Sequence, residues 1–472
     1  MATGGYSNDA GSFAALSAFA GDYLHLEETI SLSAQYGVRS RTLQLGLTKP
    51  LVPDNHVQAG FAIYVQRFRY DESQEASLLA FSRTVAEPEF LSPDDRLKYV
   101  SHRYGAESFV NLALRDRFSN VRLSYSFDVT GVRPLTAATE DYFRGLHFLN
   151  TSGTNHLSGI HASKIAAAYF RSTIDHPLRP THGTMLSASF GLAGLGGDVN
   201  LLEPAVEAKW FRRGLWRKHV LAAHVRASIL SGFGGKAAPP FDRDYLGGEQ
   251  EIRGFSSWAV SPIAYLPGTA KIPVFNTDGS QRVVLVISDP GGVVTSVPVT
   301  ITTPVYRPLT VGGDTKAVAN VEYRIPLVGP FTLALFTDAG VDRASFPHQL
   351  QLNSGVIDSL AAQFPDVGLL PSRILVETGS KQVRMSSGVE LQVFVPKLHV
   401  PLRLYWAYNV VACTGVMAET AERPCNVLFG GLIASPSEYP NNATYQAAKA
   451  MFGPQIFHDP QSMLRLAIGF SF

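Results

Sequence analysis

Apolar and polar residues alternate with a period of two over many separate segments of this 472-residue chain. Residues 320–325 read Asn-Val-Glu-Tyr-Arg-Ile, and residues 464–472 alternate in the same way up to Phe472. Because successive side chains of a β-strand point to opposite faces, this period is typical of strands with one apolar and one polar face. The pattern therefore predicts an all-β protein.

Alternation fits two architectures, a soluble barrel or sandwich with an apolar interior and a membrane barrel with an apolar exterior. The lengths of the connections favour the membrane barrel. Short proline-containing links at 326–330 and 396–401 alternate with long stretches at 256–315, 341–382 and 411–461. Outer-membrane barrels have short periplasmic turns and long external loops, and we therefore expect a transmembrane antiparallel β-barrel of about 16 strands.

Composition excludes two other classes of protein. The longest aliphatic run is five residues, Val283 to Ile287, whereas a membrane-spanning helix needs about 20 apolar residues. The 40 Lys and Arg residues are balanced by 39 Asp and Glu residues, which leaves no positive surplus for binding phosphates. We expect neither spanning helices nor a nucleic-acid partner.

The sequence contains no motif that we would assign to an enzyme. The segment Gly234-Gly235-Lys236 is followed by Ala237, where a phosphate-binding loop requires Ser or Thr. His156 and His161 lack the HExxH spacing of a zinc site, and no GxSxG nucleophile elbow occurs. We predict a protein that is not an enzyme and that has no cofactor and no metal site.

The most informative segment is FDRDYLGGEQEIRGF, residues 241–255. It is followed by NVEYRIPL at 320–327 and by ALFTDAG at 334–340. These three segments resemble the signature segments of the BamA/TamA superfamily of outer-membrane assembly proteins. In that family a Gly-Gly pair leads to an [IV]-R-G-[FY] tetrad, and its counterpart here is the IRGF motif, consisting of Ile252, Arg253, Gly254 and Phe255.

The resemblance implies that the IRGF motif lies at the tip of the sixth external loop, about residues 232–315, and that this loop folds back into the barrel. Arg253 would then reach the lumen wall, with Glu322, Phe336 and Asp338 as its partners by motif. We expect the loop to brace the wall opposite the edge of the barrel that moves.

The alternation supports these partners independently of the family. Glu322 lies on the polar face of its segment, and Phe336 and Asp338 share a face opposite Leu335, so all three point into the predicted lumen. A guanidinium inside a barrel needs acceptors, which two carboxylates supply, and an aromatic ring adds a cation-π contact of about 0.5–2 kcal/mol. The alternative is that Arg253 is a solvated loop arginine and Asp338 a turn residue.

Two further segments resemble the family. DHPLRPTHGTMLSASFG, residues 175–191, is similar to the turn before its ninth strand. The chain end resembles the terminal-strand signal of outer-membrane barrels, with Ala467 in place of the usual glycine. Gly469 is where relatives carry a glycine that kinks the last strand, although a gap-filling role in the lumen is an alternative. The residues of this C-terminal signal are Arg465, Ala467, Gly469, Phe470 and Phe472.

Cys413 and Cys425 fall in the predicted last external loop, about residues 411–461, with eleven residues between them. In the chain-entropy model, a disulfide bond between them would stabilise the fold by roughly 3 kcal/mol. An exported loop is in an oxidising environment, where such a bond can form. We expect this disulfide, with two free thiols as the alternative.

The resemblance covers nearly the whole chain, and we expect residues 1–472 to form a single outer-membrane β-barrel domain. Relatives usually carry periplasmic POTRA domains before the barrel, and nothing of this kind precedes Gly11. We therefore expect the chain to be a barrel domain from a longer protein. That protein would bind periplasmic lipoproteins through the missing POTRA domains.

The resemblance also implies a function in the bacterial outer membrane. A barrel avoids exposed edges by pairing its first and last strands, here residues 2–7 and 462–472. If that seam opens into the lipids, an unfolded client strand can pair with the first strand. We therefore expect a factor that inserts unfolded outer-membrane proteins. A TamA-like or two-partner-secretion translocation pore is the alternative within the family, and a passive porin is the alternative outside it.

Overall fold

The computed structural model of the chain describes most of its residues. The described ranges are 2–7, 11–23, 27–51, 56–71, 79–80, 96–150, 152–177, 179–216, 218–287, 294–365, 372–377, 381–395, 400–412, 431–452, 459–469 and 471. Cys413, Cys425, Phe470 and Phe472 lie outside these ranges, so the predicted disulfide stays a prediction.

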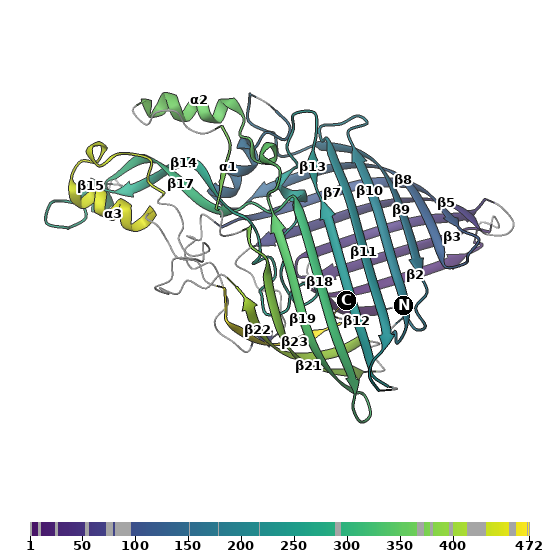
Figure 1. Cartoon of the computed structure of the whole chain (residues 1–472). Coiled ribbons are helices and arrows are strands. Elements are labelled where there is room, and N and C mark those ends of the chain that lie inside the picture. Colours follow the sequence, from purple (N-terminus) through teal and green to yellow (C-terminus); the bar gives the residue numbers. More distant parts are fainter. Residues whose placement is uncertain are drawn as a thin grey trace.

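One antiparallel sheet forms the wall of a barrel (Figure 1). Each long strand pairs with the next along the chain, and two two-residue strands, β6 (Leu79–Ala80) and β13 (Ser231–Gly232), join the same sheet. The other 16 strands are β1 (Ala2–Ser7), β2 (Gly11–Gly21), β3 (Thr29–Gly37), β4 (Ser40–Pro50), β5 (Val57–Asp71), β7 (Lys98–Ala113), β8 (Ser119–Pro134), β9 (Ile160–Ser172), β10 (Gly183–Ala193), β11 (Leu201–Arg213), β12 (Val220–Ile229), β18 (Thr315–Pro326), β19 (Phe331–Arg343), β21 (Arg384–Val395), β22 (Val400–Val411) and β23 (Ser462–Ile468). The predicted fold class is confirmed.

The exposure of side chains on the two faces of the wall distinguishes a membrane barrel from a soluble barrel or sandwich. On β18 the outward side chain of Val321 is 48% exposed, whereas the inward Asn320 and Glu322 are 2% and 0% exposed. Leu43, Leu45 and Leu47 of β4 also point outward and are exposed. An apolar exterior around a polar interior is the arrangement of a barrel that has lipid on its outside.

Long connections carry the remaining structure and gather at one end of the barrel (Figure 1). In their described parts they contain helices α1 (Ala137–Gly145), α2 (Ser354–Gln363) and α3 (Asn442–Phe452), short 3-10 helices at Pro240–Asp242, Pro347–Leu350 and Pro436–Glu438, and strands β14 (Ile263–Pro273), β15 (Val283–Ile287), β16 (Val294–Pro298), β17 (Thr300–Thr310) and β20 (Leu375–Val376). Thr136 and Asn353 cap the starts of α1 and α2 by accepting hydrogen bonds from the first-turn backbone. Within the described residues, no helix has the length and hydrophobicity to cross a membrane.

A core of apolar and aromatic side chains fills the end of the lumen that lies next to these long connections. Tyr70 and Tyr99 reach it from the wall, and Tyr142 and Phe143 reach it from α1. Burial raises the pKa of Tyr142 to about 12, and its hydroxyl donates a 3.0 Å hydrogen bond to the carbonyl of Val311. This end of the barrel is therefore packed with side chains.

The first and last strands are not paired with each other in the described part of the chain. β1 pairs with β2, and β23 pairs with β22 and with the short β6, through Arg465 with Ala80 and Leu466 with Leu79. β23 has seven residues, whereas β22 has twelve. The regular strand ends at Ile468, earlier than the predicted residue 472, and Gly469 follows it with a φ of +113°. Among the described residues of the predicted seam, the two strands therefore share no backbone ladder.

Candidate functional site

The IRGF motif lies inside the barrel, on the connection between β13 and β18. The preceding glycines allow the connection to turn back on itself, since Gly247 and Gly248 have φ values of +122° and +96°. The amide of Gly248 donates to the carbonyl of Phe255 at 3.1 Å, and the amide of Ile252 donates to the carbonyl of Gly248 at 3.1 Å. The Gly-Gly pair and the motif thus form one compact turn.

Arg253 lies against the lumen wall and is 1% exposed. Its Nε and Nη2 donate to Asp338 Oδ2 and Oδ1 at 2.7 and 2.8 Å, and its Nη1 donates to Glu322 Oε1 at 2.7 Å. The guanidinium carbon is 3.7 Å from the centre of the Phe336 ring. The structure therefore brings together Arg253 and all three residues predicted as its partners.

A third carboxylate, which the sequence did not indicate, completes the cluster. Glu390 of β21 accepts from Arg253 Nη1 at 3.2 Å and from Arg403 Nε and Nη2 at 3.0 and 2.9 Å. Arg324 donates to Glu322 Oε2 at 2.8 Å. Three arginines thus face three carboxylates, and the formal charges cancel. This balance matters because a buried charge is costly unless it is paired and hydrogen-bonded.

The residues that flank Arg253 anchor the turn as well. Ile252 and Phe255 are fully buried in a small apolar cluster with Leu246, Val260 and Val318. Gly254 has a φ of +91°, and an added Cβ would overlap the side-chain oxygen of Asn409. Gly254 therefore meets both requirements for glycine, a left-handed backbone and a close approach to the wall.

Contacts of the loop continue to the last strand of the barrel. Asn409 Nδ2 of β22 donates to the carbonyl of Gly254 at 2.8 Å, and Arg465 Nη2 of β23 donates to Ser256 Oγ at 3.2 Å. The expectation that the loop braces the wall opposite the moving edge is therefore wrong. The carboxylates lie on β18, β19 and β21, and the same part of the wall continues directly to β22 and β23.

The loop also reaches the other side of the seam. Trp258, with a φ of +66°, stacks on Tyr70 of β5 with ring centres 4.4 Å apart. The guanidinium carbon of Arg39, in the link between β3 and β4, is 3.5 Å from the centre of the Trp258 ring. The loop thus contacts β22 and β23 on one side of the seam, and β5 and the link between β3 and β4 on the other.

Some of the C-terminal residues identified in the sequence lie on the inward face of β23, and others lie beyond the end of this strand. Arg465 and Ala467 lie on the inward face of β23 and are 2% and 1% exposed. Ala467 packs with Phe336 and Tyr405, which places it beside the ring that covers Arg253. Gly469 lies just beyond the strand, where its positive φ redirects the chain. Ser471 follows and accepts a long hydrogen bond of 3.5 Å from Arg324 Nη2.

Comparisons with known proteins agree with this geometry. Residues 26–417 match the family model described as the Omp85 superfamily domain. The chain is 35% identical over 107 residues to "Outer membrane protein assembly factor BamA" of Nitratidesulfovibrio vulgaris, which is 22% of this chain and 13% of that protein. The protein of the same name from Neorickettsia risticii is 22% identical over 266 residues, 55% of this chain and 30% of the relative.

Two further comparisons extend the match. A "Sorting and assembly machinery component 50 homolog" of Xenopus tropicalis is 35% identical over 95 residues, 19% of this chain and 20% of that protein. The crystal structure of Haemophilus ducreyi BamA lacking POTRA domains 1–3 superposes with a TM-score of 0.58 at 15% identity, over 99% of this chain and 69% of that one. The matched segments cover less than a third of each of these curated relatives. Because the family model spans most of the chain, this protein belongs to the Omp85 superfamily and is an outer-membrane β-barrel.

Proposed function

We propose that residues 1–472 form the single barrel domain of an outer-membrane protein assembly factor. Its clients are unfolded outer-membrane proteins, which it inserts through the seam between β1 and β23. The observation that carries this proposal is the absence of a backbone ladder between these strands in the described residues. A β-strand edge in lipid leaves donors and acceptors unsatisfied at several kcal/mol each. Pairing with a client strand satisfies them.

The IRGF loop holds the strands beside the seam in position. Its arginine binds β18, β19 and β21, and its neighbours bind β22 and β23. Trp258 binds the opposite flank through Arg39 and Tyr70. A loop that is fixed on both sides of the seam limits how far the two sides separate. The free energy for insertion comes from the folding of the client.

The packed external end of the barrel favours assembly over passive diffusion. The aromatic and apolar core beside the long connections occupies the place where a porin has an open channel. The translocation pore of a TamA-like or two-partner-secretion protein stays the alternative within the family. Periplasmic lipoproteins would be further partners, docking on domains outside this chain, and outer-membrane lipids would surround the barrel.

A reversible covalent bond across the seam tests the proposal. One cysteine is placed in β1 and one in β23, in a variant whose Cys413 and Cys425 are serine. We expect the oxidised protein in liposomes to stop inserting an unfolded barrel client and to recover when it is reduced. The control links Trp406 to Leu464, which are register partners on β22 and β23, and should insert clients normally.

Normal insertion through a fully cross-linked seam would contradict the proposal. Single-channel recording separates the two other classes. A steady, large conductance would favour a porin, whereas conductance that rises only when a secreted polypeptide is added would favour a translocation pore.

A further inference from the structure

A hollow of about 500 Å³ lies on the outer face of the barrel wall, across β5, β7, β8, β9 and β10, which are labelled in Figure 1. Leu123 and Tyr125 of β8, Ile165 of β9 and Phe190 of β10 line it. These four side chains are 41–48% exposed and lie on the apolar face of their strands. The hollow therefore opens to the outside of the barrel and not to the lumen.

The register of the strands accounts for the hollow, because it places short side chains beside long ones. Ala167 of β9 pairs with Leu123 on one side and with Phe190 on the other. Ser108 of β7, in the adjacent outward row, pairs with Tyr125. Since register partners stand side by side on one face of a sheet, the short side chains of Ala167 and Ser108 leave a depression between larger ones.

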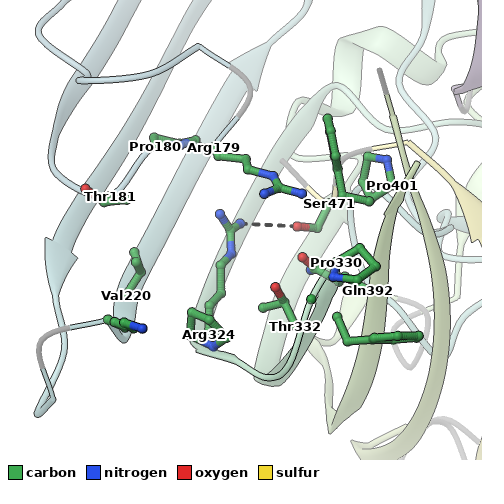
Figure 2. A pocket seen from close by; sticks show the side chains of 15 residues that line it. Arg179, Pro180, Thr181, Val220, Arg324, Pro330, Thr332, Gln392, Pro401 and Ser471 are labelled. Atoms are coloured by element: carbon green, nitrogen blue, oxygen red, sulfur yellow. Dashed lines mark hydrogen bonds between the residues drawn. The ribbon is translucent and has the colours of Figure 1, made fainter. Parts of the chain in front are cut away.

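The described lining of this hollow carries no charged side chain. The hydroxyl of Tyr125 is hydrogen-bonded to Ser163 Oγ at 3.0 Å, so its polar end already has a partner. By contrast, Figure 2 shows the guanidinium groups of Arg179 and Arg324 directed into the hollow at the short-turn end of the lumen. The hollow on the outer wall is therefore suited to an uncharged apolar group.

Packing decides what fills a depression on this face of the wall. The outward face of the barrel lies in hydrocarbon, where lipid tails are as apolar as the side chains and dispersion contacts replace the hydrophobic effect. Atoms that line an unfilled depression lose these contacts. A volume of about 500 Å³ falls within the range of about 300–1,000 Å³ that is usual for ligand sites. A single flexible hydrocarbon chain can follow such a depression.

The height of the hollow on the wall indicates which leaflet supplies the chain. Ala59, which also lines the hollow, is the third residue of β5, and Val110 of the lining lies three residues before the end of β7. Both of these strand ends adjoin short turns. Because the short turns of outer-membrane barrels are periplasmic, the hollow lies beside the periplasmic leaflet.

We propose that this hollow binds an acyl chain of a phospholipid from the periplasmic leaflet. The chain lies over Ala167 and Ser108, and it contacts the side chains of Leu123, Tyr125 and Phe190. Along the sheet, β8 and β9 lie midway between β1 and β23. The bound chain therefore packs against the wall across the barrel from the seam, and the proposal does not rest on the proposed function.

A photoreactive lipid tests the proposal. The purified barrel is placed in nanodiscs with phosphatidylethanolamine that carries a diazirine in the middle of one acyl chain. After illumination, mass spectrometry locates the lipid adducts. We expect at least about fivefold more adduct on the outward residues of the hollow than on the outward residues of β18, which corresponds to a preference of about 1 kcal/mol.

Filling the hollow should remove this excess of adduct. Ala167→Phe places a ring where the chain lies, and the matched control is Ala319→Phe, at an exposed position of β18 away from the hollow. The control should keep the excess. If Ala167→Phe does not give the heat-modified gel shift of a folded barrel, Ser108→Leu fills the same space from β7.

Equal labelling of the hollow and of β18 would overturn the proposal, and so would an excess that persists after the hollow is filled. A second probe carries the diazirine on the headgroup. It should label the short turns, and labelling of the hollow as strong as with the chain probe would also overturn the proposal. Loss of client insertion would contradict only the proposed function, because this assay contains no client.

Discussion

Arg253 and Asp338 are joined by two parallel hydrogen bonds, from Nε to Oδ2 at 2.7 Å and from Nη2 to Oδ1 at 2.8 Å. The backbone amide of Arg253 also donates to Asp338 Oδ2, at 3.1 Å. This bidentate arrangement fixes the plane of the guanidinium as well as its position. The remaining donor, Nη1, is thereby directed to Glu322 and Glu390.

Replacing Arg253 with Ala should loosen the loop without unfolding the barrel. The change leaves three buried carboxylates with two arginines, and breaking a buried ion pair costs about 3–5 kcal/mol. We expect faster proteolysis within residues 233–314 and slower client insertion, while the heat-modified gel shift of the folded barrel persists. Arg253→Lys keeps the charge but loses the bidentate geometry, so it should be intermediate. Unchanged protection of the loop in the Ala variant would contradict this role.

Glu322→Gln and Asp338→Asn should not act additively. Both carboxylates bind the same guanidinium, and residues within one network show interaction energies of about 0.5–3 kcal/mol. The double variant should resemble Arg253→Ala in loop proteolysis. A sum of two independent effects, measured by a double-mutant cycle on urea unfolding, would show that the two acids act separately.

Glu390→Gln should weaken the loop anchor even though Glu390 is outside the IRGF signature. Its carboxylate binds both Arg253 and Arg403, so its neutralisation leaves an uncompensated positive charge in the wall. Combining it with Arg403→Met should restore part of the stability, because both members of the buried pair are then removed. If the midpoint of urea unfolding of the single variant equals that of the wild type, Glu390 does not contribute to the stability of the barrel.

Trp258→Ala should separate the loop from the β3–β5 side of the barrel. It removes the ring under Arg39 and the stack on Tyr70, and truncation of a buried Trp costs about 3–5 kcal/mol. We expect more efficient cross-linking of β1 and β23 to an added client strand, because the gap is less restrained. Trp216→Ala, in an exposed turn, is the control and should leave the yield unchanged.

Gly254→Ala should disturb the turn for two separable reasons. The positive φ of +91° is unfavourable for alanine, at a cost of about 1–3 kcal/mol, and the new Cβ overlaps the Asn409 side chain. Asn409→Ala in the same chain removes the overlap with Asn409, but it leaves the backbone strain and the close approach to the Ala407 Cβ, and it removes the hydrogen bond from Asn409 to the Gly254 carbonyl. The pair should therefore recover only part of the lost loop protection, and full recovery would mean that the strain, the Ala407 contact and the lost hydrogen bond are all negligible.

The wall of the barrel follows from the sequence because each strand carries its own alternation. The partners of Arg253 could be predicted because the family resemblance named them and the phase of Glu322, Phe336 and Asp338 agreed. Glu390, Arg403 and Asn409 also carry inward-facing polar groups, but their contacts depend on where the loop lies in three dimensions. The position of the loop also decides which strands it contacts, and for this reason the prediction that it braces the wall opposite the seam was wrong.

The short last strand has a consequence for the surrounding bilayer. A transmembrane strand needs about 9–11 residues to cross the hydrocarbon layer, and β23 has seven. We therefore expect lipids beside β23 to meet a hydrophobic girdle shorter than their acyl chains, and to adapt by thinning locally. Under the proposed function, a thinner and less ordered patch of membrane at this edge would lower the barrier that an incoming hairpin has to overcome.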